Sequence, residues 1–123
     1  MILYFSATGN SEYVARRIAA ETGDIAVSIT DCYKKQIFSF DEKCKTLGIV
    51  SPTYSWGLPV IVIEFLQRLD LSHKPDYIFF IATYGTTPGQ TGRFADNILA
   101  PKGLPLSAKF SVKMPDTWTP IFD

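Results

Sequence analysis

Short continuous runs of hydrophobic residues alternate along the chain with stretches in which hydrophobic residues recur every three or four positions. Continuous runs are typical of strands buried on both faces, and the periodic stretches are typical of amphipathic helices. The predicted strands cover residues 1–5, 25–29, 47–50, 77–83 and 106–114. The predicted helices cover residues 11–22, 58–69 and 90–100. This alternation predicts a single α/β domain over residues 1–123, with a mostly parallel sheet and helices on both faces.

Several of these elements begin or end at residues that favour helix or strand boundaries. Gly23 is expected to cap the first helix, Pro59 to occupy the first position of the second, and Pro101 to end the third. Ser51 and Pro52 are expected to end the strand before the second helix. The side chains expected to face the core in the third helix are Phe94, Ala95, Ile98 and Leu99.

Residues 30–45 show neither the helical nor the strand period. We expect a short helix or an irregular segment there, packed on the domain by Ile37, Phe38 and Phe40.

Residues 115–123, after the last predicted strand, are also without a clear period. They contain Pro115 and Pro120, so a regular helix is not expected. The sheet would then lack its last helix, and one face should expose an apolar patch. A segment missing from the chain or a second subunit would cover the patch, with Trp118, Ile121 and Phe122 as candidate docking residues.

Charge and hydropathy exclude several classes of protein. The 12 basic and 12 acidic residues give a formal net charge of zero, so no electrostatic footprint for nucleic acid is expected. The hydrophobic runs are too short to span a bilayer, and Met1 leads directly into a strand-like run without the basic start of a signal peptide. We therefore expect a cytoplasmic protein that binds neither nucleic acid nor membrane.

The residues that commonly carry metal or nucleophilic chemistry are few. Cys32 and Cys44 match no metal-binding spacing and are expected to be reduced thiols. His73 is the single histidine and lies in a polar stretch that reads as a solvated loop. No metal site and no catalytic side chain are predicted.

A hydroxyl-rich turn lies between the first predicted strand and the first predicted helix. The first N–H groups of a helix have no partner within it, and the helix dipole favours an anion there. The turn contains no lysine or arginine, so neutral donors would hold the anion, which suits a phosphate monoester. The turn comprises Ser6, Ala7, Thr8, Gly9, Asn10 and Ser11. The same residue types also serve as ordinary helix caps, and that alternative stays open.

Two further loops follow the carboxyl ends of predicted strands. In open α/β sheets, ligands bind outside these ends, near the point where the strand order reverses. The aromatic side chains Tyr54, Trp56 and Tyr84 could stack on a flat ligand, or could simply cap the end of the sheet. The loop residues expected at the ligand are Pro52, Thr53, Tyr54, Ser55, Trp56 and Gly57, followed by Thr83, Tyr84 and Gly85.

These three loops carry a family resemblance. Residues 5–11, with the sequence FSATGNS, resemble the phosphate loop of flavodoxins. Residues 52–59 resemble the second flavin-binding segment of the flavodoxin part of flavodoxin–ferredoxin fusion proteins, and residues 83–85 are similar to the third. The resemblance implies an open parallel sheet of about five strands in the order 2-1-3-4-5, an order for which flavodoxin is a standard example.

The resemblance also implies a ligand and a function. FMN would bind non-covalently, with its phosphate on the first loop and its ring between the aromatic side chains of the other two. Gly57 would turn its carbonyl toward the ring. The protein would carry electrons between unidentified redox partner proteins, cycling FMN between oxidised, semiquinone and hydroquinone forms.

Two other functions remain open on the sequence. One is an FMN-dependent reductase that uses NAD(P)H and a quinone-type acceptor. The other is a non-redox module of the same fold that binds phosphate or a partner protein.

Overall fold

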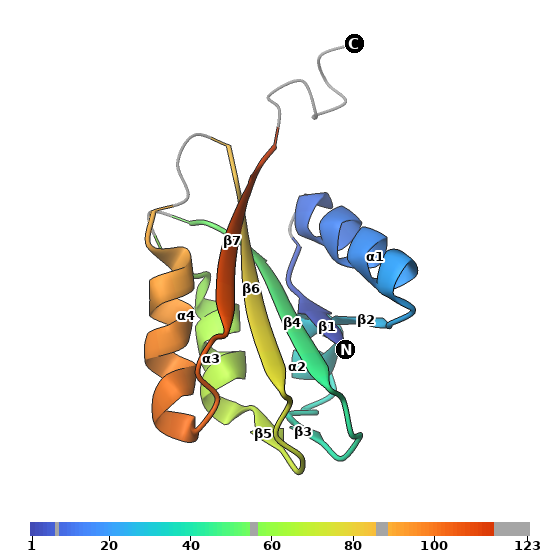
Figure 1. Cartoon of the computed structure of the whole chain (residues 1–123). Helices are drawn as coiled ribbons and strands as arrows, with labels where there is room; N and C mark the ends of the chain where they lie inside the picture. Colours follow the sequence, from blue (N-terminus) through green and yellow to red (C-terminus); the bar gives the residue numbers. More distant parts are fainter. Residues whose placement is uncertain (7, 55–56, 86–88, 115–123) are drawn as a thin grey trace.

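The computed structural model describes residues 1–6, 8–54, 57–85 and 89–114. Strands and helices alternate through these residues, as the hydrophobic pattern predicts (Figure 1). The elements are β1 (Ile2–Tyr4), α1 (Asn10–Thr22), β2 (Ala26–Ser28), α2 (Ile29–Lys34), β3 (Ser39–Phe40), β4 (Thr46–Pro52), α3 (Val60–Arg68), β5 (Asp70–Leu71), β6 (Tyr77–Tyr84), α4 (Thr91–Leu99), the 3₁₀ helix η1 (Ala100–Lys102) and β7 (Ala108–Lys113). None of the helices in the described ranges is long and apolar enough to cross a membrane.

The main sheet has five parallel strands in the order β2-β1-β4-β6-β7. Numbered within this sheet alone, the order is 2-1-3-4-5, which confirms the expected topology. The chain runs from β1 outward to β2 and then crosses back to β4. The strand order therefore reverses between β1 and β4, and this is the switch point at which open α/β sheets bind ligands.

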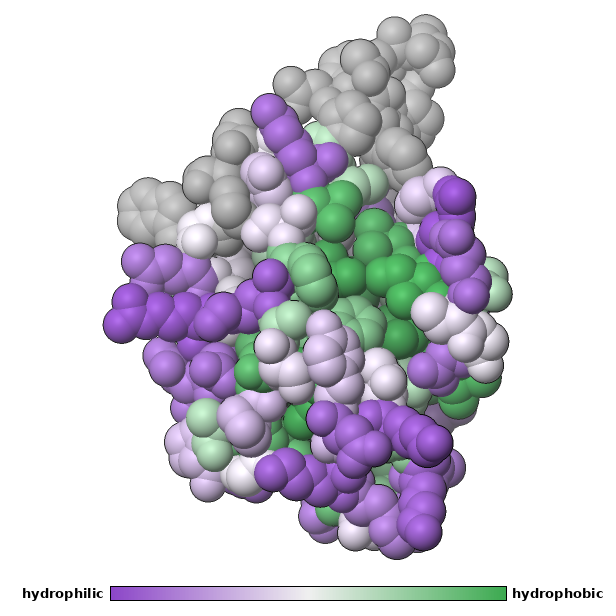
Figure 2. Space-filling view, viewed as in Figure 1, coloured by the Kyte–Doolittle hydropathy of each residue, from purple (hydrophilic) through white to green (hydrophobic). Residues whose placement is uncertain are grey.

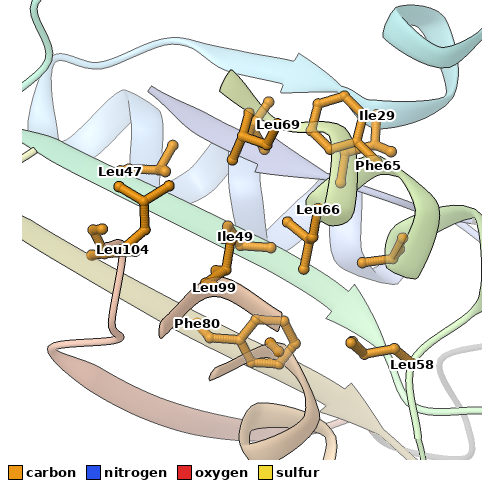
Figure 3. Close-up of a cluster of buried hydrophobic side chains, with 14 of the residues drawn as sticks. Ile29, Leu47, Ile49, Leu58, Phe65, Leu66, Leu69, Phe80, Leu99 and Leu104 are labelled. Carbon is orange, nitrogen blue, oxygen red and sulfur yellow. The ribbon is translucent and has the colours of Figure 1, made fainter. Parts of the chain in front are cut away.

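One face of the sheet carries the larger hydrophobic core, with α2, α3 and α4 packed against it (Figures 1 and 3). Figure 3 shows the apolar side chains of these helices meeting those of the central strands. The largest fully buried side chains on this face are Leu3, Ile29, Leu47, Ile49, Phe65, Leu66, Leu69, Ile78, Phe80 and Leu99. Burial on this scale supplies most of the driving force for folding.

The described residues cover the opposite face only in part. Among the described helices, α1 alone packs there, over β1, β2 and β4. Beyond it, Phe79 of β6 lies between two aromatic residues, with ring centroids 6.0 Å from Tyr77 and 6.5 Å from Phe110. Tyr77 is 41% and Phe110 50% exposed. Figure 2 shows hydrophobic side chains on the sheet beside α1. The predicted docking residues of the tail lie outside the described residues, so the uncovered apolar patch stays a prediction.

The weakly patterned segment 30–45 contains more regular structure than the sequence predicts. Its helix, α2, begins at Ile29, where the second strand was expected to continue, because Ser28 caps it by accepting a hydrogen bond from the N–H of Asp31 at 3.2 Å. β3 then pairs with β5 in a small parallel sheet that was not predicted. Phe38 is buried, whereas Ile37 is exposed and the expectation that it packs inward is wrong. Gln36 has a φ of 56°, so the chain turns sharply before these two residues.

Three expected boundaries are displaced. β4 continues through Pro52, because the next residue, Thr53, makes the following bond to β6 by donating its N–H to the Thr83 carbonyl at 3.0 Å. Pro59 precedes α3 and caps it with its carbonyl, which accepts bonds from the first turn at 3.0 and 3.1 Å. Pro101 lies within η1, so the chain continues after α4 as a short 3₁₀ helix. Gly103, with a φ of 80°, caps that helix.

The third helix differs from its predicted inward face at one residue. Phe94 was expected in the core and is exposed. Its ring lies against the backbone of Gly57, where an added Cβ would stand 3.3 Å from the ring. Phe94 therefore joins α4 to the loop after β4 instead of packing beneath the sheet.

Candidate functional site

The three candidate loops meet at one edge of the sheet. They follow β1, β4 and β6, which are neighbouring parallel strands, so their carboxyl ends point the same way. The first of these loops leads into α1, whose amino end stands at the switch point between β1 and β4 (Figure 1). The structure thus brings together the described parts of the three segments that the sequence placed at a ligand.

The first loop presents the amino end of α1 without a capping side chain. Gly9 is the residue before the helix, with a left-handed φ of 96°, and glycine has no side chain to cap the first N–H groups. Its own N–H donates to Ser6 Oγ at 2.8 Å, which closes the turn. The N–H groups that open α1 therefore face a turn shaped by glycine and serine, and Thr8 lies exposed on it.

Asn10, the first residue of α1, carries an unusual side chain. Its Oδ1 is buried and has no hydrogen-bond partner among the described residues. Leaving a buried polar atom unpaired costs about 1–3 kcal/mol. A ligand hydroxyl could satisfy Oδ1, and rotation of the amide would instead present two N–H donors to an anion. The first loop therefore fits a polar, anionic ligand.

The second loop is a narrow excursion closed by two backbone hydrogen bonds. Tyr54 N–H donates to the Gly57 carbonyl at 2.9 Å, and Gly57 N–H donates back to the Tyr54 carbonyl at 2.8 Å. The exposed Tyr54 ring packs edge-on against Phe5, with the ring centroids 6.3 Å apart, and so joins the second loop to the first. An aromatic side chain thus stands beside the turn that leads into α1.

The third loop begins at the end of β6. Tyr84 is partly buried, and its carbonyl accepts the N–H of Met114 at 2.8 Å, while Gly85 is exposed. Three of the predicted contact residues, Ala7, Ser55 and Trp56, lie outside the described residues.

Beneath the loops lies a set of hydroxyl contacts. Ser11 Oγ and Thr83 Oγ1 are 2.9 Å apart, and Thr53 Oγ1 is 2.9 Å from Thr91 Oγ1. Sequence reasoning placed Ser11, Thr53 and Thr83 at the ligand but missed the buried Thr91. The sequence did offer one sign of Thr91: it is a threonine at the start of a helix that follows a glycine-containing loop.

The charges on the first turn of α1 are neutralised locally. Glu12 accepts a hydrogen bond from Arg16 Nε at 2.7 Å. Burial raises the pKa of the Tyr4 hydroxyl, the Glu12 carboxylate raises it further, and Arg16 acts in the opposite direction. Tyr4 therefore stays neutral at physiological pH, and Glu12 does not present an unpaired negative charge to the loop.

Comparison with known proteins agrees with this geometry. A family model described as "Flavodoxin domain" matches residues 1–120. The two-electron reduced flavodoxin of Megasphaera elsdenii has 20% sequence identity and a TM-score of 0.67, over 94% of this chain and 89% of that one. The FMN-bound flavodoxin of Fusobacterium nucleatum has 16% identity and a TM-score of 0.60, over 85% and 66%.

A larger protein contains a similar fold. The Flv1 flavodiiron core of Synechocystis sp. PCC6803 has 20% identity and a TM-score of 0.68 over 93% of this chain, which spans only 30% of that protein. No match is found among curated proteins. The family match extends over nearly the whole chain and coincides with the strand order and loop arrangement described above, so the chain belongs to the flavodoxin domain family.

Proposed function

We propose that this domain binds FMN and transfers electrons through it. The observation that carries the proposal is the glycine-led amino end of α1 at the switch point of the sheet, beside the unpaired Oδ1 of Asn10. Family membership supports it, as do the similar structures whose titles name flavodoxins and bound FMN.

The first loop suits the phosphate of FMN. Thr8 is exposed on it, and the N–H groups that open α1 supply neutral donors. Tyr54 and Tyr84 stand on the loops that would flank the ring, and the sequence places Trp56 on the same loop as Tyr54. The residues proposed to surround FMN are Ser6, Ala7, Thr8, Gly9, Asn10, Ser11, Pro52, Thr53, Tyr54, Ser55, Trp56, Gly57, Thr83, Tyr84 and Gly85.

FMN, when bound, supplies the redox chemistry, because it can accept and release electrons. The protein's own residues hold the phosphate, orient the ring and exclude water from its faces. No side chain is required to transfer a proton. We therefore favour an electron carrier that acts with redox partner proteins over an enzyme with its own substrate.

The cellular setting and the assembly are also proposals. Cys32 and Cys44 are free thiols, which suits a reducing compartment such as the cytoplasm. The aromatic patch around Phe110 would be covered by a second subunit or by a further segment of chain.

The carrier can be separated from a reductase by two assays on the same FMN-loaded protein. The chemically reduced protein should pass electrons rapidly to a one-electron acceptor such as ferricyanide. It should show negligible steady turnover with NAD(P)H and a quinone. Sustained NAD(P)H oxidation would identify a reductase, and a protein that takes up no FMN would identify a non-redox module.

A further inference from the structure

Two hydroxyl groups that the sequence places at the ligand lie against each other beneath the loops. Ser11 Oγ and Thr83 Oγ1 are 2.9 Å apart, in a contact that joins residues 72 positions apart in the chain. Ser11 is only 1% and Thr83 only 2% exposed. Both side chains are therefore buried, and each hydroxyl has the other as a hydrogen-bond partner.

Thr83 also contacts the second loop. Its carbonyl accepts the N–H of Thr53 at 3.0 Å, at the point where the chain leaves β4. The Thr53 hydroxyl in turn lies 2.9 Å from that of Thr91 at the start of α4. Through its side chain and its backbone, Thr83 therefore connects the first turn of α1 with the loop after β4.

We propose that Thr83 is a positioning residue, which acts through Ser11 to set the amino end of α1 relative to the two loops that flank the flavin ring. This inference rests on the proposed function, in which α1 holds the phosphate and those loops hold the ring. FMN must reach both parts at once. Its affinity therefore depends on their alignment, as the affinity of any ligand with two linked binding groups does.

The inference makes a distinction among three ligands. Riboflavin lacks the phosphate and uses the ring loops alone, while inorganic phosphate uses the amino end of α1 alone. Loosening the Ser11–Thr83 contact should lower the affinity for FMN and leave the affinities for riboflavin and phosphate nearly unchanged. A hydroxyl that touched phosphate directly would weaken phosphate as well, and a general loss of structure would weaken all three.

The experiment uses Thr83→Val, which removes the hydroxyl and keeps the side-chain shape, and Thr83→Ser, which keeps the hydroxyl. Ser11→Ala and the double variant Ser11→Ala/Thr83→Val complete a cycle. Flavin fluorescence gives the Kd of FMN and riboflavin, and inorganic phosphate is measured by its competition with FMN. Circular dichroism and urea unfolding confirm that each variant is folded.

Thr83→Val should weaken FMN by about three- to tenfold, the range expected for one neutral hydrogen bond. The Kd values of riboflavin and phosphate should change by less than about twofold. Thr83→Ser, which keeps the hydroxyl, should bind FMN as tightly as wild type. Because Ser11 and Thr83 act as a pair, the double variant should bind FMN no more weakly than the weaker single variant.

Three results would each overturn the inference and leave the proposed function standing. They are equal losses of affinity for FMN and riboflavin, a matching loss of affinity for phosphate, and additive losses of FMN affinity in the double variant. Wild-type protein that binds neither flavin would overturn the proposed function, and the inference would fall with it.

Discussion

Replacing Gly9 by alanine should weaken both FMN binding and folding, whereas the same change at Gly23 should weaken folding only. The two glycines stand at opposite ends of α1, with φ of 96° and 69°. At both positions an added Cβ would meet no atom within 4 Å, so the cost is backbone strain and not steric conflict. Holding a residue other than glycine in this left-handed region costs about 1–2 kcal/mol.

The consequence for the ligand differs because of what each glycine holds. Gly9 donates its N–H to Ser6 Oγ at 2.8 Å and accepts the Tyr13 N–H at 2.9 Å. Relief of strain there would move both the turn and the first N–H groups of α1. Gly23 only closes the far end of the helix, toward Ala19.

Urea unfolding should show each variant about 1–2 kcal/mol less stable than wild type. Fluorescence titration should show Gly9→Ala binding FMN at least about tenfold more weakly, a difference of about 1.4 kcal/mol. Gly23→Ala should bind FMN as wild type does. Unchanged FMN binding in Gly9→Ala, or an equal loss in Gly23→Ala, would refute the assignment of the first loop to the phosphate.

Three further changes test other parts of the structure. Lys102 Nζ lies 2.6–3.0 Å from three carbonyl oxygens at the end of α3, so Lys102→Met should lower the free energy of unfolding by about 2 kcal/mol. Lys34→Met, in the last turn of α2, is the control, and equal effects would contradict the reasoning. Phe110→Asp should reduce binding of a dye that detects apolar surface, and unchanged binding would show that the patch is not the dye's site. Thr8→Ala should weaken FMN by at least about tenfold because a hydrogen bond to a charged group is lost, and an equal loss for riboflavin would show that Thr8 does not hold the phosphate.

The sequence predicted the parts of the fold that depend on local pattern. Continuous apolar strands and amphipathic helices located the elements, and their alternation indicated a parallel sheet whose loops after β1, β4 and β6 share one edge. The order of the strands came from the family resemblance, because the hydrophobic period does not say which strands are neighbours. The expectation of a partly covered face came from counting the predicted helices, and the exposure of Phe110 among the described residues agrees with it.

Features that depend on contacts between distant residues were missed. The Ser11–Thr83 pair joins two segments far apart in the chain, and a serine in a turn looks the same whether it faces a ligand or a buried threonine. β3 and β5 are two residues long, too short to show a period. Phe94 fits the inward stripe of a helix, yet it lies against Gly57, whose position could not be known in advance.

Titration of the purified protein with FMN tests whether this domain is a flavoprotein. Visible absorption and flavin fluorescence should change together and saturate at equimolar FMN, with the fluorescence quenched by the neighbouring aromatic side chains. Riboflavin should bind measurably more weakly, because the amino end of α1 would have no phosphate to hold. A spectrum and fluorescence indistinguishable from free FMN throughout the titration would contradict the proposed function.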